Sequence, residues 1–402
     1  MVEKINSDYA DVVQVVRPGF PDFSDFPWQF PLSEWANHTD KLIEAPRGVS
    51  RHVVVFAILD GIIYAFKELP LGVAAKEYNL LLEMEQLHLP SVIPVGFRSP
   101  ASDLLDTEVL ITRYLEFSLP YRSLFMSSSL VKYREHLLDA MAGLLVQLHL
   151  AGVYWGDCSL SNALFKRDAG ALQAYLVDAE TSEIFPDGLP AGLRFTDIEI
   201  MEENIDGGLY DLRGANLLGQ GVPVHDTGAY VRLRYHSLWD EINRTLIINP
   251  GENFRIHERI RALNELGFSV GGIELSQTDD GDHLRMEVLV TDRNFHRDQL
   301  ITLTGVEAGE RQARQMMNEI QQTKAVLSRE NNRSTPLSAA AYYWLDHLYG
   351  PIVARIKECR VTDNDLAELY CQVLEHKWYL SERAGRDVGH QAAVEDYLRR
   401  VE

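Results

Sequence analysis

The chain has 402 residues, of which 46% are hydrophobic and 24% are charged, as in a globular protein with a large buried core. Its formal net charge of −21 argues against binding to nucleic acid or to anionic membranes, because both select for clustered Lys and Arg. Three cysteines without metal-ligand spacing, no signal-peptide pattern and no apolar run of membrane-spanning length predict a cytoplasmic protein without a transmembrane segment.

The first 45 residues alternate prolines with aromatic residues, and this pattern prevents a continuous helix. Exposed aromatic side chains would be costly in water, so we expect residues 1–45 to form an extended arm packed on a neighbouring domain. A short linear docking motif is the alternative. Further along, two apolar runs over 53–59 and 62–67 flank Asp60-Gly61, which predicts a β-hairpin.

A helix is predicted over 72–87, where Leu80, Leu81, Met84 and Leu87 recur at helical spacing. Two further apolar runs, 92–97 and 108–114, predict strands. The first half of the chain therefore has the order strand, strand, helix, strand, strand.

The middle of the chain combines an apolar helix, a polar loop and a second hairpin. The helix is predicted over 130–151 and leads directly into Asp157 and Asn162. Strands predicted over 162–166 and 172–177 follow, and Asp178 comes directly after the second of them. An Asp followed five positions later by an Asn is a weak signal by itself, because both residues are common in turns. The surrounding helix and hairpin favour a functional site over a simple turn.

Beyond about residue 221 the pattern is mainly helical, and no motif there indicates a chemistry. Helices are predicted over 230–247, 255–266, 308–329, 337–349 and 363–382, and strands over 269–276 and 283–291.

Taken together, these residues resemble the protein-kinase-like superfamily, and most closely its bacterial lipopolysaccharide-kinase-like branch, in a family with a C-terminal extension. The resemblance covers about residues 46–185. It implies an α+β, bilobal protein-kinase-like fold with a mainly helical C-terminal extension. The implied parts are an N-terminal arm (1–45), a small lobe (46–115), a large-lobe core (116–220) and a mainly helical region of unknown role (221–402).

The resemblance also implies a role for each site residue. Asp157 would orient the attacking hydroxyl and accept its proton, while Asn162 and Asp178 would bind Mg²⁺. Lys67 would contact the ATP phosphates, and Glu77 on the following helix would hold Lys67 in place.

Two other segments would complete the ATP site. Thr112, Tyr114 and Leu115 lie where the adenine-binding hinge belongs, and Ser50 and Arg51 would reach the phosphates from the loop 45–52.

Three departures separate the chain from protein kinases. The His-Arg before the catalytic Asp is replaced by Tyr154-Trp-Gly, and the Asp-Phe-Gly triplet becomes Asp178-Ala-Glu, which adds an acid that could bind a second metal ion. The phosphate-covering loop has one glycine, Gly48, where protein kinases use three.

The expected activity is ATP- and Mg²⁺-dependent phosphoryl transfer to a hydroxyl acceptor on a sugar, a small metabolite or a protein. The altered phosphate-covering loop is also compatible with an alternative function, that of a nucleotide-binding pseudokinase in which the helical half is the output module. Transfer of AMP by the same fold and a non-enzymatic scaffold that binds a partner protein also stay open. The sequence does not indicate the acceptor.

Overall fold

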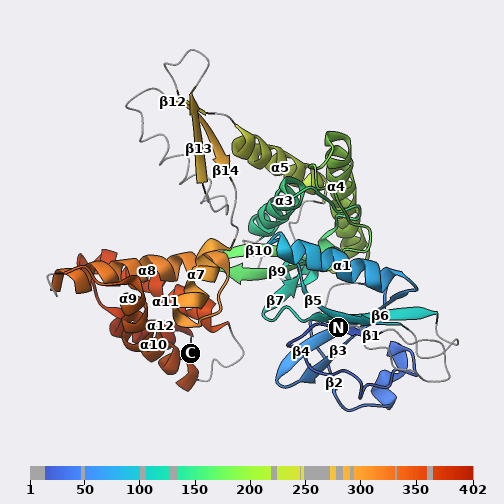
Figure 1. Ribbon diagram of the computed structural model, residues 1–402, viewed down its shortest axis with the longest axis horizontal. Coiled ribbons are helices and arrows are strands. Elements are labelled where there is room, and N and C mark those ends of the chain that lie inside the picture. Colours follow the sequence, from blue (N-terminus) through green and yellow to red (C-terminus); the bar gives the residue numbers. More distant parts are fainter. Residues whose placement is uncertain are drawn as a thin grey trace. The chain divides into compact units, whose positions relative to one another are not determined.

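The computed structural model describes residues 14–46, 50–99, 106–126, 134–218, 224–244, 246–248, 272–277, 284–289, 294–330, 333–359 and 365–401 (Figure 1). The helix predicted over 255–266 lies outside these residues. The chain divides into two compact units. The first comprises Met1–Lys166 and Gln173–Glu241, and the second comprises Arg167–Leu172 and Ile242–Glu402. In the part of the chain that is described, no helix has the length and apolar character to cross a membrane.

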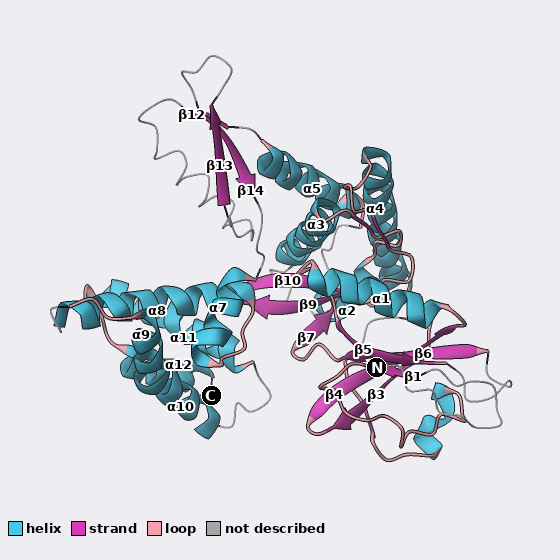
Figure 2. Cartoon of the chain, viewed as in Figure 1, coloured by secondary structure: helices cyan, strands magenta, loops and turns pink. Residues whose placement is uncertain are grey.

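The first unit begins with a six-stranded antiparallel sheet of order β1-β5-β6-β4-β3-β2, drawn in magenta in Figure 2. The helix α1 (Val73–Gln86) packs against β5, β6 and β4. Asp60 and Gly61 have φ angles of 52° and 78°, the left-handed values that a tight hairpin turn requires. The strands are β1 (Gln14–Val16), β2 (Leu42–Ile43), β3 (Val54–Leu59), β4 (Ile62–Pro70), β5 (Ile93–Arg98) and β6 (Thr107–Arg113).

The N-terminal arm is built into this sheet. Its residues form both β1 and β2, with a short 3₁₀ helix, η1 (Leu32–Asn37), between them. Its buried aromatic rings pack around Phe66 of β4, and the ring centroids of Phe26 and Trp35 lie 4.9 and 5.3 Å from that of Phe66. Phe23, Phe26 and Trp28 are thus buried, while Phe20 and Phe30 are partly buried against the same cluster.

The rest of the first unit is mainly helical, with two small sheets of order β10-β9-β7 and β11-β8. The long helix α4 contacts β8 and η3, so it lies directly against the segment that carries Asp157. This helix was not predicted from the sequence. The elements are β7 (Ser118–Pro120), α2 (Tyr121–Met126), α3 (Arg134–Leu150), β8 (Val153–Tyr154), η3 (Leu160–Asn162), β9 (Ala163–Asp168), β10 (Ala171–Leu176), β11 (Glu183–Ile184), α4 (Ala191–Gly214) and α5 (Thr227–Asn243).

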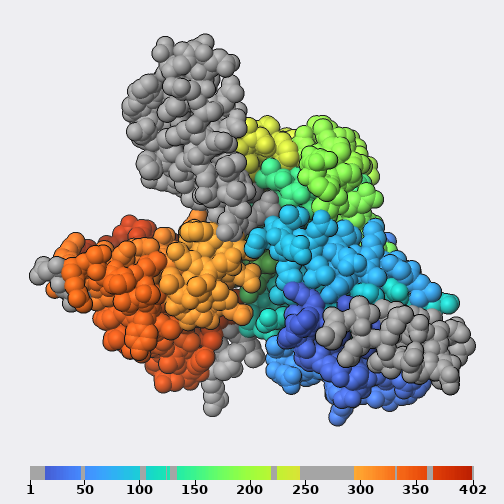
Figure 3. Space-filling model, viewed as in Figure 1, coloured from blue at the N-terminus to red at the C-terminus, as the bar shows by residue number. Residues whose placement is uncertain are grey.

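The second unit contains a bundle of helices around one buried core, coloured orange to red in Figure 3. Trp344, Tyr370 and Met316 lie in this core and are inaccessible to solvent. A separate three-stranded antiparallel sheet has the order β12-β14-β13. The elements are β12 (Leu246–Ile248), β13 (Gly272–Gln277), β14 (Leu284–Leu289), α7 (Phe295–Thr304), α8 (Glu310–Glu330), α9 (Leu337–Trp344), the π-helix η4 (Leu345–Tyr349), α10 (Gly350–Glu358), α11 (Leu366–Ala384) and α12 (His390–Val401).

Several predicted boundaries in the C-terminal half were wrong. The helix predicted over 230–247 ends at Asn243, and Leu246–Ile248 is a strand. The helix predicted over 337–349 does not stop there but continues through η4 into α10. In this π-helical turn the Gly350 amide donates to the Leu345 carbonyl, and a Cβ at residue 350 would lie 2.8 Å from that oxygen, so glycine permits the close approach.

Candidate functional site

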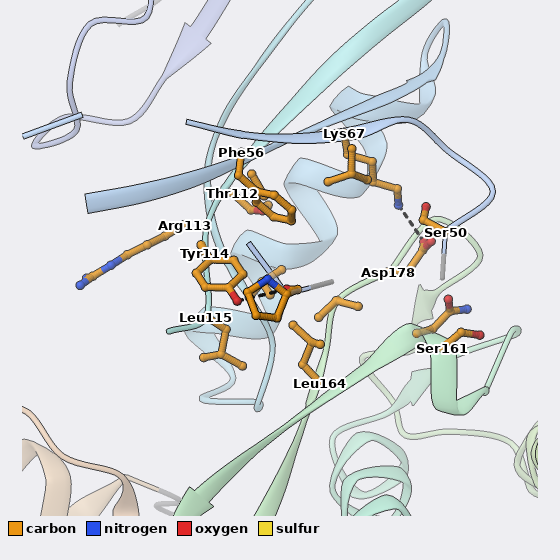
Figure 4. Close-up of a pocket in the computed structure, with 16 residues that line it drawn as sticks. Ser50, Phe56, Lys67, Thr112, Arg113, Tyr114, Leu115, Ser161, Leu164 and Asp178 are labelled. Atoms are coloured by element: carbon orange, nitrogen blue, oxygen red, sulfur yellow. Dashed lines mark hydrogen bonds and ion pairs between the residues drawn. The ribbon is translucent and has the colours of Figure 1, made fainter. Parts of the chain in front are cut away.

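A pocket in the first unit collects residues from the sheet, from the β6–β7 connection and from the segment around β9 (Figure 4). It encloses about 750 Å³ including its open mouth, which is the size of a cavity for a small organic ligand. Its lining residues are Pro46, Ser50, Val54, Phe56, Ala65, Lys67, Val92, Thr112, Arg113, Tyr114, Leu115, Ser161, Asn162, Leu164, Val177 and Asp178.

Lys67 places a positive charge in this pocket, between two carboxylates. The side chains of β4 alternate between the two faces of the sheet, so Ala65 and Lys67 line the pocket while Phe66 joins the aromatic cluster. The Nζ atom of Lys67 lies 3.0 Å from Oε2 of Glu77 and 3.0 Å from Oδ1 of Asp178. Burial by itself would lower the pKa of the Lys67 ammonium, but the two carboxylates outweigh burial and raise it. Lys67 therefore stays charged.

Glu77 lies behind Lys67 and is fully buried on α1. Besides both contacts with Lys67, its Oε1 accepts a hydrogen bond of 3.1 Å from the Ala179 amide. Burial raises the pKa of Glu77 to about 7, although the Lys67 charge opposes this. Glu77 thus joins helix α1 to the residue that follows Asp178.

Asp157 is held by two asparagine side chains. Nδ2 of Asn162 donates to the Asp157 carbonyl oxygen at 3.0 Å and to its Oδ2 at 3.1 Å. Nδ2 of Asn204, on α4, donates to the other carboxylate oxygen of Asp157 at 3.3 Å and to the Cys158 carbonyl at 3.1 Å. These donors fix the direction of the Asp157 carboxylate.

Asp197 fixes the backbone just before Asp157 and was missed by the sequence reasoning. It is fully buried on α4 and accepts hydrogen bonds from the amides of Trp155 at 2.7 Å and Gly156 at 2.8 Å. Nε2 of His149 lies 3.1 Å from the same carboxylate. A signal for this helix was present, because apolar residues recur every three or four positions at Ile198, Met201, Ile205, Leu209 and Leu212.

Glu180 contacts the segment that precedes β3, which was predicted from the sequence to cover the phosphates. Arg51 Nη2 and His52 Nε2 lie 3.2 and 3.0 Å from Oε2 of Glu180, and Lys76 donates to the Glu180 carbonyl at 3.2 Å. Arg51 is therefore outside the pocket lining, whereas Ser50 is part of it. Gly48 lies outside the described residues.

Thr112, Tyr114 and Leu115 form the pocket wall at the β6–β7 connection. The Tyr114 amide donates to the Ile63 carbonyl at 2.9 Å, and the Tyr114 hydroxyl donates to the Pro46 carbonyl at 3.1 Å. In Figure 4, Lys67 and Asp178 point toward each other, while Arg113 extends away from them.

The structure thus brings most of the predicted site residues to one pocket, namely Ser50, Lys67, Thr112, Tyr114, Leu115, Asn162 and Asp178. Glu77, Arg51 and Asp157 do not line it. Glu77 holds Lys67, Arg51 contacts Glu180, and Asp157 contacts Asn162.

The residues present fit a Mg²⁺ ion bound together with a nucleotide. Asn162 and Asp178 supply an amide and a carboxylate oxygen to the same pocket, and Mg²⁺ in such sites takes its remaining ligands from phosphates and water. Among the residues that the structure describes, no group of three or more His, Cys, Asp and Glu side chains is placed to hold a metal ion. A binding mode that depends on phosphate ligands does not require such a group.

Two protein-family models match the chain, and each matches a different part of it. Residues 62–184 match the model of the lipopolysaccharide kinase (Kdo/WaaP) family, and residues 237–401 match that of a domain of unknown function (DUF4032). No curated protein matches the chain.

Solved structures that match include "WaaP in complex with acyl carrier protein", with 14% identity and a TM-score of 0.34, covering 57% of this chain and 89% of that one. An aminoglycoside-3'-phosphotransferase of type VIII matches with 13% identity and a TM-score of 0.31, covering 48% of this chain and 92% of that one.

The fold is α+β and bilobal, of the protein-kinase-like class, with a mainly helical C-terminal extension, as the sequence predicted. Within that class, the segment from β4 to β11 is similar to the lipopolysaccharide-kinase-like branch of the kinase-like phosphotransferases. The predicted resemblance is confirmed.

Proposed function

We propose that the first unit binds Mg²⁺-ATP and transfers the terminal phosphoryl group to a hydroxyl of a sugar, a small metabolite or a protein. The observation that carries this proposal is the position of Lys67. Its ammonium lies within about 3 Å of both Glu77 and Asp178, in the pocket that Asn162 also lines. A buried Lys between these carboxylates is suited to hold nucleotide phosphates.

The orientation of Asn162 supports a role in cation binding. Because its Nδ2 donates to Asp157, its Oδ1 is turned away from that carboxylate. Asn162 Oδ1 and the Asp178 carboxylate would hold Mg²⁺, which would neutralise charge on the phosphates. Lys67 would donate hydrogen bonds to the phosphate oxygens, and Thr112, Tyr114 and Leu115 would border the adenine.

Asp157 would orient the hydroxyl of the acceptor and take up its proton. Its carboxylate is aligned by Asn162 and Asn204, and it can accept a hydrogen bond from the attacking hydroxyl. As the acceptor oxygen bonds to the terminal phosphorus, the bond from that phosphorus to the leaving ADP oxygen breaks, and the hydroxyl proton passes to Asp157. In-line positioning and charge neutralisation would supply most of the rate.

The test is nucleotide turnover by the full chain with pooled sugars, small metabolites and proteins as acceptors. The proposal predicts Mg²⁺-dependent release of ADP and acceptors heavier by one phosphoryl group in mass spectrometry. Asp157→Asn, whose side-chain oxygen can still accept from Nδ2 of Asn162, should keep Mg²⁺-ATP affinity close to that of the wild type and lose about a hundredfold or more of this turnover.

Other products would contradict the proposal. Adenylyl-modified acceptors would indicate AMP transfer. Tight Mg²⁺-ATP binding without turnover of any acceptor would indicate a nucleotide-binding regulator.

A further inference from the structure

The β9–β10 hairpin belongs to both units of the chain. Its tip, Arg167–Leu172, is part of the second unit, whereas the remainder of both strands is part of the first. Asn162 immediately precedes β9, and Asp178 follows the end of β10 by two residues. The two candidate metal ligands are therefore at the base of the hairpin whose tip lies among the C-terminal helices.

Asp168 attaches the tip to the start of helix α8. This side chain is only 4% exposed, and its two oxygens accept hydrogen bonds from the amides of Gln312 at 2.8 Å and Arg311 at 3.1 Å. Amides at a helix N-terminus lack partners within the helix, so Asp168 satisfies them from outside the helix. Gly309 makes this approach possible, because a Cβ at that position would lie 2.6 Å from the Asp168 carboxyl group.

Glu368 of α11 binds the turn itself. Its Oε2 accepts from the Ala169 amide at 2.8 Å and its Oε1 from the Gly170 amide at 3.2 Å. Gln312, which is fully buried, donates from Nε2 to Glu368 at 3.0 Å and to the Arg167 carbonyl at 3.3 Å. Ala169 and Gly170 have φ angles of 51° and 78°, so the turn exposes successive amides to one carboxylate.

The β9–β10 turn could close without buried carboxylates, so the hydrogen bonds of Asp168 and Glu368 have a further structural role. Two carboxylates, Asp168 and Glu368, are each 4% exposed, and burying them is costly unless their oxygens are hydrogen-bonded. Their partners come from the hairpin tip and the helices together. The tip is therefore a structural part of the helical bundle, and the strands connect it over a few residues to Asn162 and Asp178.

We propose that the helical C-terminal unit sets the affinity for Mg²⁺-ATP by holding the tip of the β9–β10 hairpin, with Glu368 and Gln312 as positioning residues for Asn162 and Asp178. This inference rests on the proposed function. The paired strands limit how far the two metal ligands can move relative to each other once the tip is fixed. Loss of the contacts at the tip frees the hairpin and weakens binding at its base.

The experiment compares Glu368→Ala with Glu319→Ala in the full chain. Glu319 is the matched control, because its side chain, 11% exposed, belongs to the same helical unit and accepts hydrogen bonds from Trp344, Tyr370 and His390 instead of from the tip. The readouts are the dissociation constant of Mg²⁺-ATP by calorimetry and the amide hydrogen exchange of residues 163–177. Circular dichroism checks that each variant is folded, and Glu368→Gln, which keeps one acceptor oxygen, serves as the milder variant.

Glu368→Ala should raise the dissociation constant by about fivefold or more and speed amide exchange in β9 and β10. Glu368→Gln should give a smaller change in the same direction, and Glu319→Ala should leave both readouts near the wild-type values. If the wild type binds Mg²⁺-ATP and both Glu368 variants bind it equally well, the inference is wrong while the proposed function stands. If the wild type does not bind Mg²⁺-ATP, the proposed function fails and the inference fails with it.

Discussion

At the scale of single residues, Asp197 explains how a loop without the usual His-Arg pair keeps its shape. Its carboxylate accepts the amides of Trp155 and Gly156, the two residues directly before Asp157. Gly156 has a φ angle of +81°, and a Cβ there would lie 2.9 Å from the Thr181 carbonyl oxygen. The buried acid and the glycine together define the path of the chain into Asp157.

Asp197→Ala should lower the free energy of unfolding by about 3 kcal/mol, because it leaves the buried Trp155 amide and the partly buried Gly156 amide without their acceptor. Urea unfolding followed by circular dichroism measures this loss. Asp187→Ala is the control, since Asp187 is exposed on the loop before α4 and its replacement should cost less than about 0.5 kcal/mol. Equal stability of the two variants would show that Asp197 does not support the loop.

His149 makes the same region sensitive to pH. Burial lowers the pKa of its imidazole, although the hydrogen bond to Asp197 opposes this, and its other nitrogen lies 2.8 Å from the Tyr235 hydroxyl. The folded protein therefore disfavours the proton that the unfolded chain takes up near its ordinary pKa of about 6.5. The stability contributed by neutral His149 is complete above that value and is lost as the pH falls below it.

The difference in the free energy of unfolding between the wild type and His149→Gln should therefore decrease between about pH 7.5 and about pH 5.5, whereas the opposite contribution from Glu77, whose pKa is raised to about 7, is common to both proteins. Urea titrations across this range test the prediction. A slope that is identical in the wild type and in His149→Gln would assign the pH dependence to other groups.

At the scale of elements, local signals predicted those parts that neighbouring residues determine. Asp60-Gly61 specifies the β3–β4 turn, and the helical spacing of Leu81 and Met84 specifies α1. Helix α4 was missed because Gly207 and Gly208 lower its helix propensity and the polar residues Asp197 and Asn204 lie on it. Both polar residues bind the loop around Asp157. Long-range contacts account for these polar residues, and a single sequence does not reveal such contacts.

The N-terminal arm supports strand β4, so its aromatic core should be essential for the sheet. Trp35 is fully buried and packs on Phe26 and Phe66, with ring centroids 5.2 and 5.3 Å apart. Trp35→Ala should lower the free energy of unfolding by about 3–5 kcal/mol, measured by circular dichroism in urea. The control is Trp378→Ala, because Trp378 is 58% exposed on α11. Similar losses in both variants would contradict a core role for the arm.

At the scale of the whole molecule, the chain combines a kinase-like unit with a helical unit that receives the tip of the hairpin between Asn162 and Asp178. The resemblance to the kinase-like superfamily predicted the pairing of Lys67 with Glu77, which the structure shows. It could not predict that Arg51 contacts Glu180, because that ion pair joins residues 129 positions apart. Nor could it predict the hydrogen bonds of Glu368 to the hairpin tip, which have almost 200 residues between their partners.

The most direct test of the Mg²⁺-ATP centre is calorimetric titration of ATP into the full chain and into Asp178→Ala, with and without Mg²⁺. The wild type should bind ATP much more tightly with Mg²⁺ than without it, since Asp178 would hold the cation against the phosphates. Asp178→Ala should lose this Mg²⁺ dependence while remaining folded. Equal ATP affinity of the wild type and Asp178→Ala in the presence of Mg²⁺ would contradict the assignment of the pocket as a kinase-like nucleotide site.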